Sequence, residues 1–206
     1  PSRTRNPIPA RSDHTPDRCS PLDAYYGAAL DDNYHVEVQE GNDLASFPKG
    51  TVDLAGVTFD ARGLIHLNGQ QIQTISSIDY PQKVTNIIIG RKAERLHFLH
   101  GAGWPSDEGQ TIAKWTIYYS DGTENVIRVH YGKDVADWWT APDAPSLSGS
   151  QAAWEGENAA SKESSMQLRL FKKTWNNPHP EKVIKAIDYA SSMKDSSPFM
   201  LAITAD

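Results

Sequence analysis

The chain has 206 residues, a length that one large β domain can fill without division into two. Its formal net charge is −6 and its basic residues are scattered apart from a few near the start, which excludes the basic stripe that a nucleic-acid-binding surface needs. No apolar run approaches the roughly 20 residues that cross a bilayer, so we expect no direct membrane insertion.

The first 43 residues are predicted to form an N-terminal arm and lead-in. Residues 1–22 are rich in Pro, Arg, Ser and Asp, and a segment so poor in apolar residues holds a conformation only by contact with another surface. We expect that surface to belong to the domain or to a partner, with Ile8 and Leu22 as apolar anchors. A short helical turn is predicted over residues 23–30, and residues 34–38 are predicted to begin the sheet. Because the chain begins with Pro rather than Met, we expect it to be part of a longer protein.

Residues 44–206 carry the predicted sandwich domain. Short β-rich runs separated by Gly and Asp predict strands at residues 44–47, 51–54, 57–59 and 64–67, and a more apolar run predicts a central strand at 84–89. From residue 95 to 131 apolar residues recur with period two, which predicts one strand and then a hairpin that turns at Asp121-Gly122. Gly101-Ala-Gly103 is predicted to lead the chain out of the sheet before Trp104.

The rest of the chain continues the β pattern. Residues 132–139 are predicted to make one or two helical turns, 141–150 a linker, and 151–156, 166–175, 183–189 and 199–204 further strands. Strands without intervening helices pair largely antiparallel, so we predict an all-β fold, a two-sheet antiparallel β-sandwich with an irregular N-terminal arm. The predicted inter-sheet core is Phe98, Trp115, Ile117, Ile127, Val129, Leu168, Leu170, Ile187, Leu201 and Ile203.

The order of four motifs resembles an uncharacterised group of bacterial domains. They are Arg95-Leu-His-Phe-Leu-His100 with Trp104, the strand from Trp115 before Asp121-Gly122, Tyr131-Gly-Lys-Asp134 with Asp137-Trp-Trp139, and Trp175-Asn-Asn-Pro178. These domains look like galactose-binding-domain-like jelly rolls appended to larger proteins. The resemblance spans roughly residues 44–206. It implies ligand sites in loops at one end of the sandwich and an extracytoplasmic location, and it carries over no catalytic residue.

Loop aromatics are the candidate ligand-binding residues. An exposed indole can stack on a sugar ring while neighbouring amides or carboxylates bond its hydroxyls. In the alternative interpretation the same tryptophans cap the ends of the core, and the amides after Trp175 stabilise a turn. Because a Trp-Trp pair in a strand points to opposite sides, we expect at most one of its rings to be free. The candidate set is Trp104, Trp138, Trp139, Trp175, Asn176, Asn177 and His100.

Metal and catalytic signatures are weak. His97 and His100 have a spacing that could ligate a metal on a helix, but on a strand the two side chains diverge. Cys19 stands alone, without neighbours at metal-ligand spacing. We therefore expect no metal site and no cofactor. The acidic turns 107–108 and 121–124 suit structural Ca²⁺ or simple solvation. Asp134 and Asp137 could supply the two carboxylates of a glycoside hydrolase or could serve a loop.

Three functions follow from these observations. The first is a non-catalytic binding module of a larger bacterial extracytoplasmic protein, which recognises carbohydrate or a neighbouring protein domain through its loop aromatics. The second is a structural spacer or protein–protein interaction domain whose aromatics are buried. The third is a carbohydrate-active enzyme. Ligand-dependent quenching of tryptophan fluorescence separates the first from the second.

Overall fold

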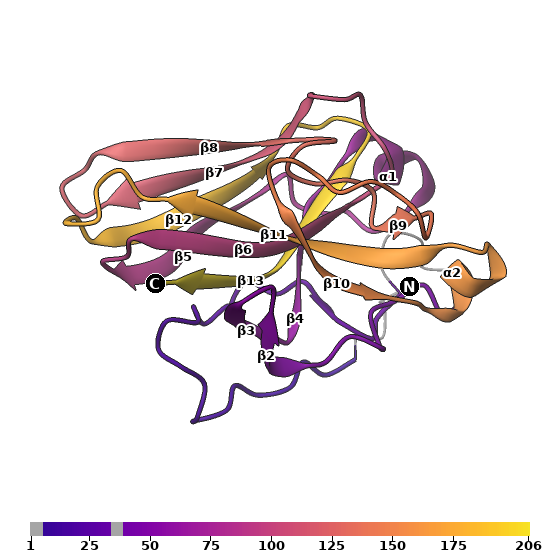
Figure 1. Cartoon of the computed structure of the whole chain (residues 1–206), viewed down its shortest axis with the longest axis horizontal. Coiled ribbons are helices and arrows are strands. Elements are labelled where there is room, and N and C mark those ends of the chain that lie inside the picture. Colours follow the sequence, from indigo (N-terminus) through magenta and orange to yellow (C-terminus); the bar gives the residue numbers. More distant parts are fainter. Residues whose placement is uncertain (1–5, 34–38) are drawn as a thin grey trace.

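A computed structural model describes residues 6–33 and 39–206. Within these residues the fold is mostly β, with antiparallel sheets packed as a sandwich, as the sequence predicts (Figure 1). The larger sheet orders its strands as β1 (Ala28–Ala29), β4 (Gly63–His66), β13 (Ser197–Ala205), β6 (Arg95–Gly103), β11 (Gln167–Asn176) and β10 (Gln151–Gly156), with β9 (Trp139–Thr140) also paired to β11. The smaller sheet orders β5 (Lys83–Arg91), β12 (Ile184–Ser191), β7 (Thr111–Tyr119) and β8 (Glu124–His130). A separate hairpin joins β2 (Gly50–Leu54) and β3 (Val57–Ala61).

The strand order is that of a jelly roll. Among the described strands, the first four of the sandwich pair with the last four in reverse order. The pairs are β4 with β13, β5 with β12, β6 with β11 and β7 with β8. The larger sheet contains the pairs β4–β13 and β6–β11, and the smaller sheet contains β5–β12 and β7–β8. This arrangement is a double Greek key. Loops that link the two sheets gather at the two ends of the sandwich.

The core between the sheets forms where the apolar phases of the strands face each other. Phe98 of β6 stacks on Trp115 of β7 with ring centroids 4.0 Å apart, and Tyr189 of β12 stacks on Trp115 at 5.6 Å. Ile117 lies in the same cluster and is fully buried. Full burial of a large apolar side chain contributes about 1.5–3 kcal/mol, so this layer is a main source of stability.

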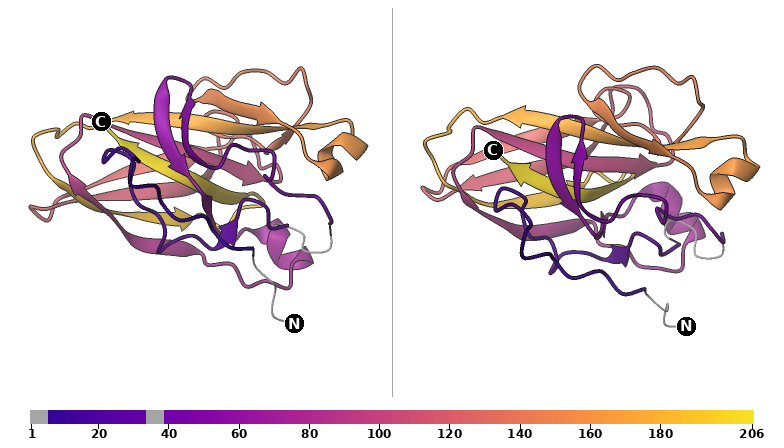
Figure 2. Two further views of the ribbon diagram at one scale, coloured as in Figure 1. Left: turned by 90° about the horizontal axis from the view of Figure 1, so that it is seen from below. Right: turned by 60° about the horizontal axis from the view of Figure 1, so that its bottom comes forward.

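A second core lies on the opposite face of the larger sheet. The hairpin β2–β3 and the N-terminal residues run across that face (Figure 2). Leu168, Leu170 and Leu201 belong to this second core, so their predicted place between the sheets is wrong, although all three are buried. The other seven predicted core residues lie in the inter-sheet cluster. The larger sheet is therefore buried on both faces, and its alternating residues are apolar on both sides.

The N-terminal arm is held against the larger sheet. Ser20 N donates to Ile203 O at 2.9 Å, and Ala205 N donates to Arg18 O at 2.8 Å, so the arm lies along the end of β13. The predicted anchor Leu22 is fully buried, whereas Ile8 is half-buried. The described part of the arm is thus ordered by contact with its own domain, as expected.

A buried ion-pair network fixes the arm in place. The Arg62 side chain is 1% exposed; its Nε donates to Asp60 Oδ1 at 3.0 Å and its Nη2 to Asp23 Oδ2 at 2.7 Å. Arg11 of the arm donates to the other oxygen of Asp60 at 2.6 Å. Charge-assisted hydrogen bonds of this kind offset the cost of removing the charges from water, and here they join three segments of the chain.

Several local predictions are wrong. Residues 44–47 form a turn instead of a strand, and 28–29 form β1 after a hydrogen-bonded turn at 22–26. Gly101-Ala-Gly103 remains in β6, where it pairs with residues 197–199 of β13, and the absence of a Cβ on Gly101 leaves room for the Phe199 ring. Residues 132–139 make one tight turn, closed by Gly132 N to Val135 O at 2.8 Å, and then join the larger sheet. The short helices α1 (Gln70–Ile75) and α2 (Ala159–Glu163) were not expected. The predicted start of the sheet at 34–38 lies outside the described residues.

Candidate functional site

The predicted site residues fall at three places along the sandwich. Trp175 pairs with Leu96 at the start of β6, while Trp104 follows the last residue of the same strand. A rise of about 3.3 Å per residue separates the backbone positions of the two tryptophans by about 25 Å along β6, so they lie at opposite ends of the sandwich. His100 lies between these ends, in the inter-sheet core. One ligand therefore cannot contact both Trp104 and Trp175.

The end with Trp175 is a structural turn. Asn177 is buried; its Oδ1 accepts from the Tyr119 hydroxyl at 2.6 Å and its Nδ2 donates to Ala93 O at 2.8 Å. Trp175 is half-buried against the inter-sheet core, and Asn176 is exposed. Asn177 thus holds the β11–β12 connection to the neighbouring strands, which is the turn role that its sequence context also allows.

His100 is a core residue. Its side chain is 1% exposed and packs edge-on against Trp115 with centroids 5.2 Å apart. Burial lowers the pKa of His100 to about 3, and the positive charge of Lys173 acts in the same direction. His97 on the other side of the strand bonds instead to Thr174 and Asp206, so the two imidazoles diverge as the strand geometry predicts.

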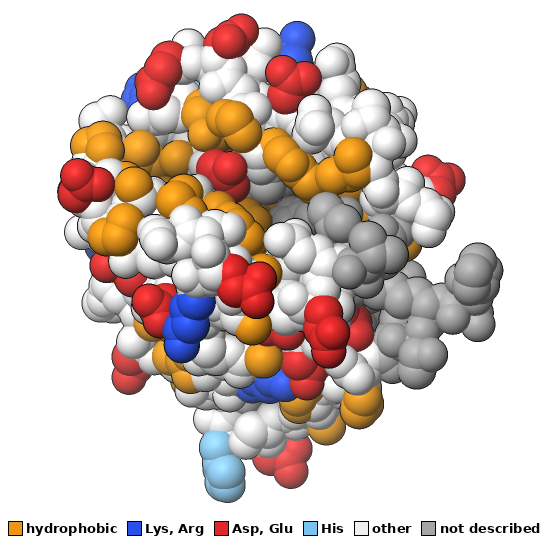
Figure 3. Space-filling model, turned by 90° about the vertical axis from the view of Figure 1, so that its right-hand side faces the viewer, with side chains coloured by type: hydrophobic (Ala, Val, Ile, Leu, Met, Phe, Trp, Pro, Cys, Tyr) orange, Lys and Arg blue, Asp and Glu red, His pale blue; other side chains and the backbone are white. Residues whose placement is uncertain are grey.

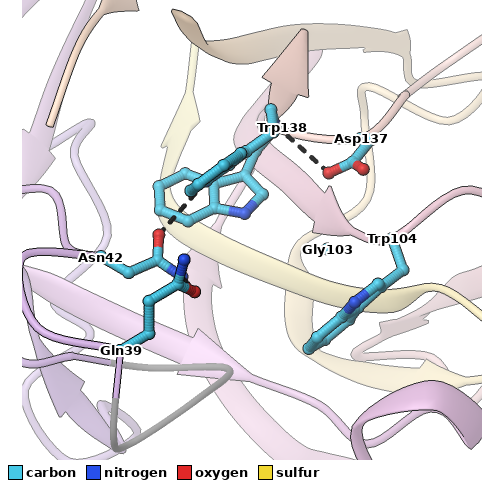
Figure 4. A pocket seen from close by; sticks show the side chains of 7 residues that line it. Gln39, Asn42, Gly103, Trp104, Asp137 and Trp138 are labelled. Carbon is cyan, nitrogen blue, oxygen red and sulfur yellow. Dashed lines mark hydrogen bonds between the residues drawn. The ribbon is translucent and has the colours of Figure 1, made fainter. Parts of the chain in front are cut away.

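At the end where β6 leaves the sheet, three of the predicted tryptophans come together. A cleft of about 240 Å³ is lined by Gln39, Asn42, Gly103, Trp104, Asp137, Trp138 and Trp139 (Figure 4). This end forms the right-hand side of Figure 1 and faces the viewer in Figure 3, where hydrophobic side chains gather around a hollowed area with acidic side chains nearby. We call this site the end cleft.

Trp104 enters the end cleft because of its unusual backbone. Its φ is +63°, in the left-handed region that large side chains rarely adopt. Ser196 Oγ donates to Trp104 O at 2.7 Å and so fixes the carbonyl after the turn. The indole is partly exposed and stands opposite Trp138 across the hollow (Figure 4), and Trp139 lines the same cleft. A strained residue of this kind persists only where its surroundings hold it, and such residues gather at functional sites.

The other wall of the end cleft comes from the segment that joins the larger sheet through β9. Trp138 N donates to Ala102 O at 2.7 Å, and its indole is 2% exposed and packs edge-on against Phe199. Trp139 remains partly exposed, and its Nε1 donates to Asn42 Oδ1 at 3.2 Å. One ring of the Trp-Trp pair is thus buried and the other reaches the surface. Both rings line the same cleft, however, so the predicted divergence to opposite sides is wrong, because Trp138 lies before the start of β9.

Asp137 is the carboxylate of the end cleft. Burial raises its pKa to about 6, although backbone N–H groups of residues 104, 138 and 139 oppose the rise by hydrogen bonding. The bond from Trp139 N to Asp137 Oδ1 measures 3.2 Å, and the Asp137 N–H donates to the Tyr131 hydroxyl at 3.2 Å. The carboxylate therefore helps to hold both tryptophan segments while it faces the cleft.

The sequence did not point to Asn42 or Gln39. They stand about 60 residues before Trp104 in the chain, and no local motif marks them. Asn42 is buried; besides Trp139 its Oδ1 accepts from Asn158 Nδ2 at 3.4 Å.

The other acidic candidates are engaged elsewhere. Asp134 is 1% exposed; it accepts from Lys173 Nζ at 2.6 Å and contacts His130 Nδ1 at 3.1 Å, and it does not line the end cleft with Asp137. Asp121 pairs with Lys182 at 2.8 Å. Among the described residues no group of three or more His, Cys, Asp or Glu side chains is placed to hold a metal ion. None of the described helices has the length and apolar character needed to span a membrane.

No protein-family model matches the chain, and no curated protein matches it significantly. The functional argument therefore rests on the fold and on the end cleft.

Proposed function

We propose that this chain is a non-catalytic module that binds carbohydrate in the end cleft. The observation that carries the proposal is the composition of that cleft: partly exposed indoles of Trp104 and Trp139 beside the polar groups of Asn42, Gln39 and Asp137. Indoles offer apolar faces to sugar rings, and amide and carboxylate groups bond hydroxyls and fix the orientation of the ligand.

The size of the end cleft indicates modest affinity. A volume of about 240 Å³ accommodates a small ligand or the end of a longer chain. A ring stacked on an open surface buries little area, and its hydroxyls exchange water for partners of similar strength. We therefore expect dissociation constants in the micromolar to millimolar range that depend on one or two indoles.

The wider setting is also part of the proposal. The jelly-roll strand order and the place of the end cleft among end loops support a galactose-binding-domain-like module. The resemblance of its motifs to bacterial extracytoplasmic domains supports a location outside the cytoplasm, within a longer protein. Cell fractionation of the tagged full-length protein tests the location.

The experiment is a glycan array followed by fluorescence titration of each hit. Trp104→Ala and Trp139→Ala should each weaken binding about tenfold or more, because each removes one stacking face. Trp175→Ala is the matched control, since it removes a half-buried indole at the opposite end. Equal losses in all three variants, or an array without any hit, would count against sugar binding in the end cleft.

A second candidate function is contact with a neighbouring domain through the outer face of the smaller sheet. Ile88 of β5 and Val126 of β8 are 46% and 37% exposed there. A shallow hollow of about 310 Å³ lies on the same sheet and includes Tyr118 and Asp188. Hydrogen exchange of this face should slow in the full-length protein relative to the isolated chain if a domain covers it, and unchanged exchange argues against the contact.

A further inference from the structure

The end cleft carries negative charge without positive charge. Among its described lining residues, Asp137 is the only side chain that ionises near neutral pH, and neither Lys nor Arg lines the cleft. Anionic ligands such as uronic acids, sulfated sugars or phosphates would find no counter-charge there and would face the carboxylate. The charge of the lining therefore restricts the ligand to a neutral or a cationic molecule.

Asp137 also has no cationic partner in residues 6–33 and 39–206. Its pKa is set by burial and by backbone N–H groups, without a contribution from any Lys, Arg or His. The titratable side chains around it are Tyr131, whose hydroxyl accepts from the Asp137 N–H, and Glu108, which lies beside Tyr131. Of the buried carboxylates in the described residues, Asp60 and Asp134 are ion-paired, and Asp32, which is 3% exposed, accepts from the backbone N–H groups of Asn6 and Ala29. Asp137 differs from them in that its charge is left facing the cleft.

We propose that the end cleft prefers a sugar that carries an ammonium group, with the ammonium seated between the Asp137 carboxylate and the indole faces of Trp104 and Trp139. This inference rests on the proposed carbohydrate-binding function. A partly desolvated carboxylate gains most from a ligand that brings its own positive charge. Indole is the best side chain for a cation–π contact, and two indoles line the same space. A neutral sugar can use the hydrogen bonds of the site but leaves the carboxylate uncompensated.

Three tetrasaccharides test the preference. Cello-, chito- and chitosan-tetraose share one β-1,4-linked backbone and differ only at C2, where they carry a hydroxyl, an acetamido or an ammonium group. Titration calorimetry at about pH 6.5 compares them, since Asp137, with its pKa of about 6, is mostly ionised there and more of the C2 amine is protonated than at pH 7. The ammonium ligand should bind about tenfold more tightly than either neutral one. The preference should shrink in about 1 M salt, where the Debye length is about 3 Å.

A pair of variants separates a local contact from general attraction. A polycation is drawn to any chain with a net charge of −6, whatever the site. Asp137→Asn removes the charge and keeps the size of the side chain, so the ammonium ligand should lose its advantage of about tenfold over both neutral ligands, whatever the change in absolute affinity. Asp107→Asn is the matched control, because Asp107 is exposed and does not line the cleft. It removes the same charge and should keep the preference. If Asp137→Asn does not fold, Trp104→Ala decides, because it removes one indole face of the proposed ammonium seat and no charge. The preference should then fall, whereas general attraction would leave it unchanged.

Each outcome bears on one of the two proposals. Equal affinity for the three ligands, or a preference that survives Asp137→Asn or high salt, overturns the ammonium inference and leaves sugar binding in place. No binding of any tetrasaccharide removes the carbohydrate function itself. Choline serves as an ammonium probe without a sugar. If choline binds as tightly as chitosan-tetraose, the cleft recognises ammonium alone, and the sugar preference is wrong.

Discussion

Protonation of His100 should contribute to the unfolding of this protein in acid. Burial lowers the pKa of His100 to about 3 in the folded protein, while an unfolded chain keeps the ordinary value of 6.5. Between these two pKa values the unfolded chain binds a proton at His100 and the folded protein does not. The free energy of unfolding is therefore unaffected by this group above pH 6.5 and decreases as the pH falls toward 3. At pH 4 the difference of about 2.5 pH units corresponds to about 3 kcal/mol of lost stability.

The assay is urea unfolding at pH 7 and pH 4 of the wild type and of His100→Gln. Carboxylates contribute to the pH dependence of both proteins, so the difference between their losses isolates the imidazole. The wild type should lose about 3 kcal/mol more than the variant between the two pH values. His14→Gln is the control, since His14 is exposed and should leave the loss unchanged. Equal losses in wild type and His100→Gln would show that the imidazole accepts its proton without unfolding, and the argument from burial would fail.

Three further predictions concern the core, the arm and the end cleft. Ile117→Ala should cost about 2–5 kcal/mol in chemical denaturation because it leaves a cavity between the sheets, and a loss within about 0.5 kcal/mol would place the side chain outside the core. Arg62→Met should lower the free energy of unfolding by about 3–5 kcal/mol, since among the described residues it leaves the buried carboxylate of Asp60 paired only with Arg11. Thermal unfolding measures the loss. An unchanged midpoint would refute the role of the network. Trp139→Phe removes the bond to Asn42 but keeps an aromatic face, so titration with a sugar ligand should show a few-fold weaker binding instead of complete loss.

The sequence predicted the strands better than their partners. The alternation around Trp115, Ile117 and Val129 is local, so it gave the correct side of each strand. The same alternation in Leu168 and Leu170 gave the right degree of burial but the wrong layer, because both faces of the larger sheet are covered. Periodicity reveals which residues share a face, and only tertiary packing decides what lies against that face.

The candidate site was predictable only in part. Trp104 and Trp139 were identified because each lies beside a loop, but which end of the sandwich each loop occupies depends on strand direction. Strand direction places Trp175 at the end of the sandwich opposite to Trp104 and Trp139. Asn42 reaches Trp139 across 97 positions of sequence, a separation at which no local pattern carries information. The turn closed by Gly132 and Val135 is local, but the segment after it was wrongly predicted to be helical, because Asp137 and Trp138 pair with Ala102 of the distant strand β6.

The position of β13 has a consequence for how the protein is made. This strand is the last of the described sandwich to leave the ribosome, yet it lies between β4 and β6 in the larger sheet. Until β13 is synthesised, β4 and β6 lack the strand that pairs with both of them. The residues around Cys19 likewise lack their backbone hydrogen-bond partners in β13. The nascent chain therefore exposes the apolar faces of both strands through most of synthesis, and the sheet closes in a late step of high contact order.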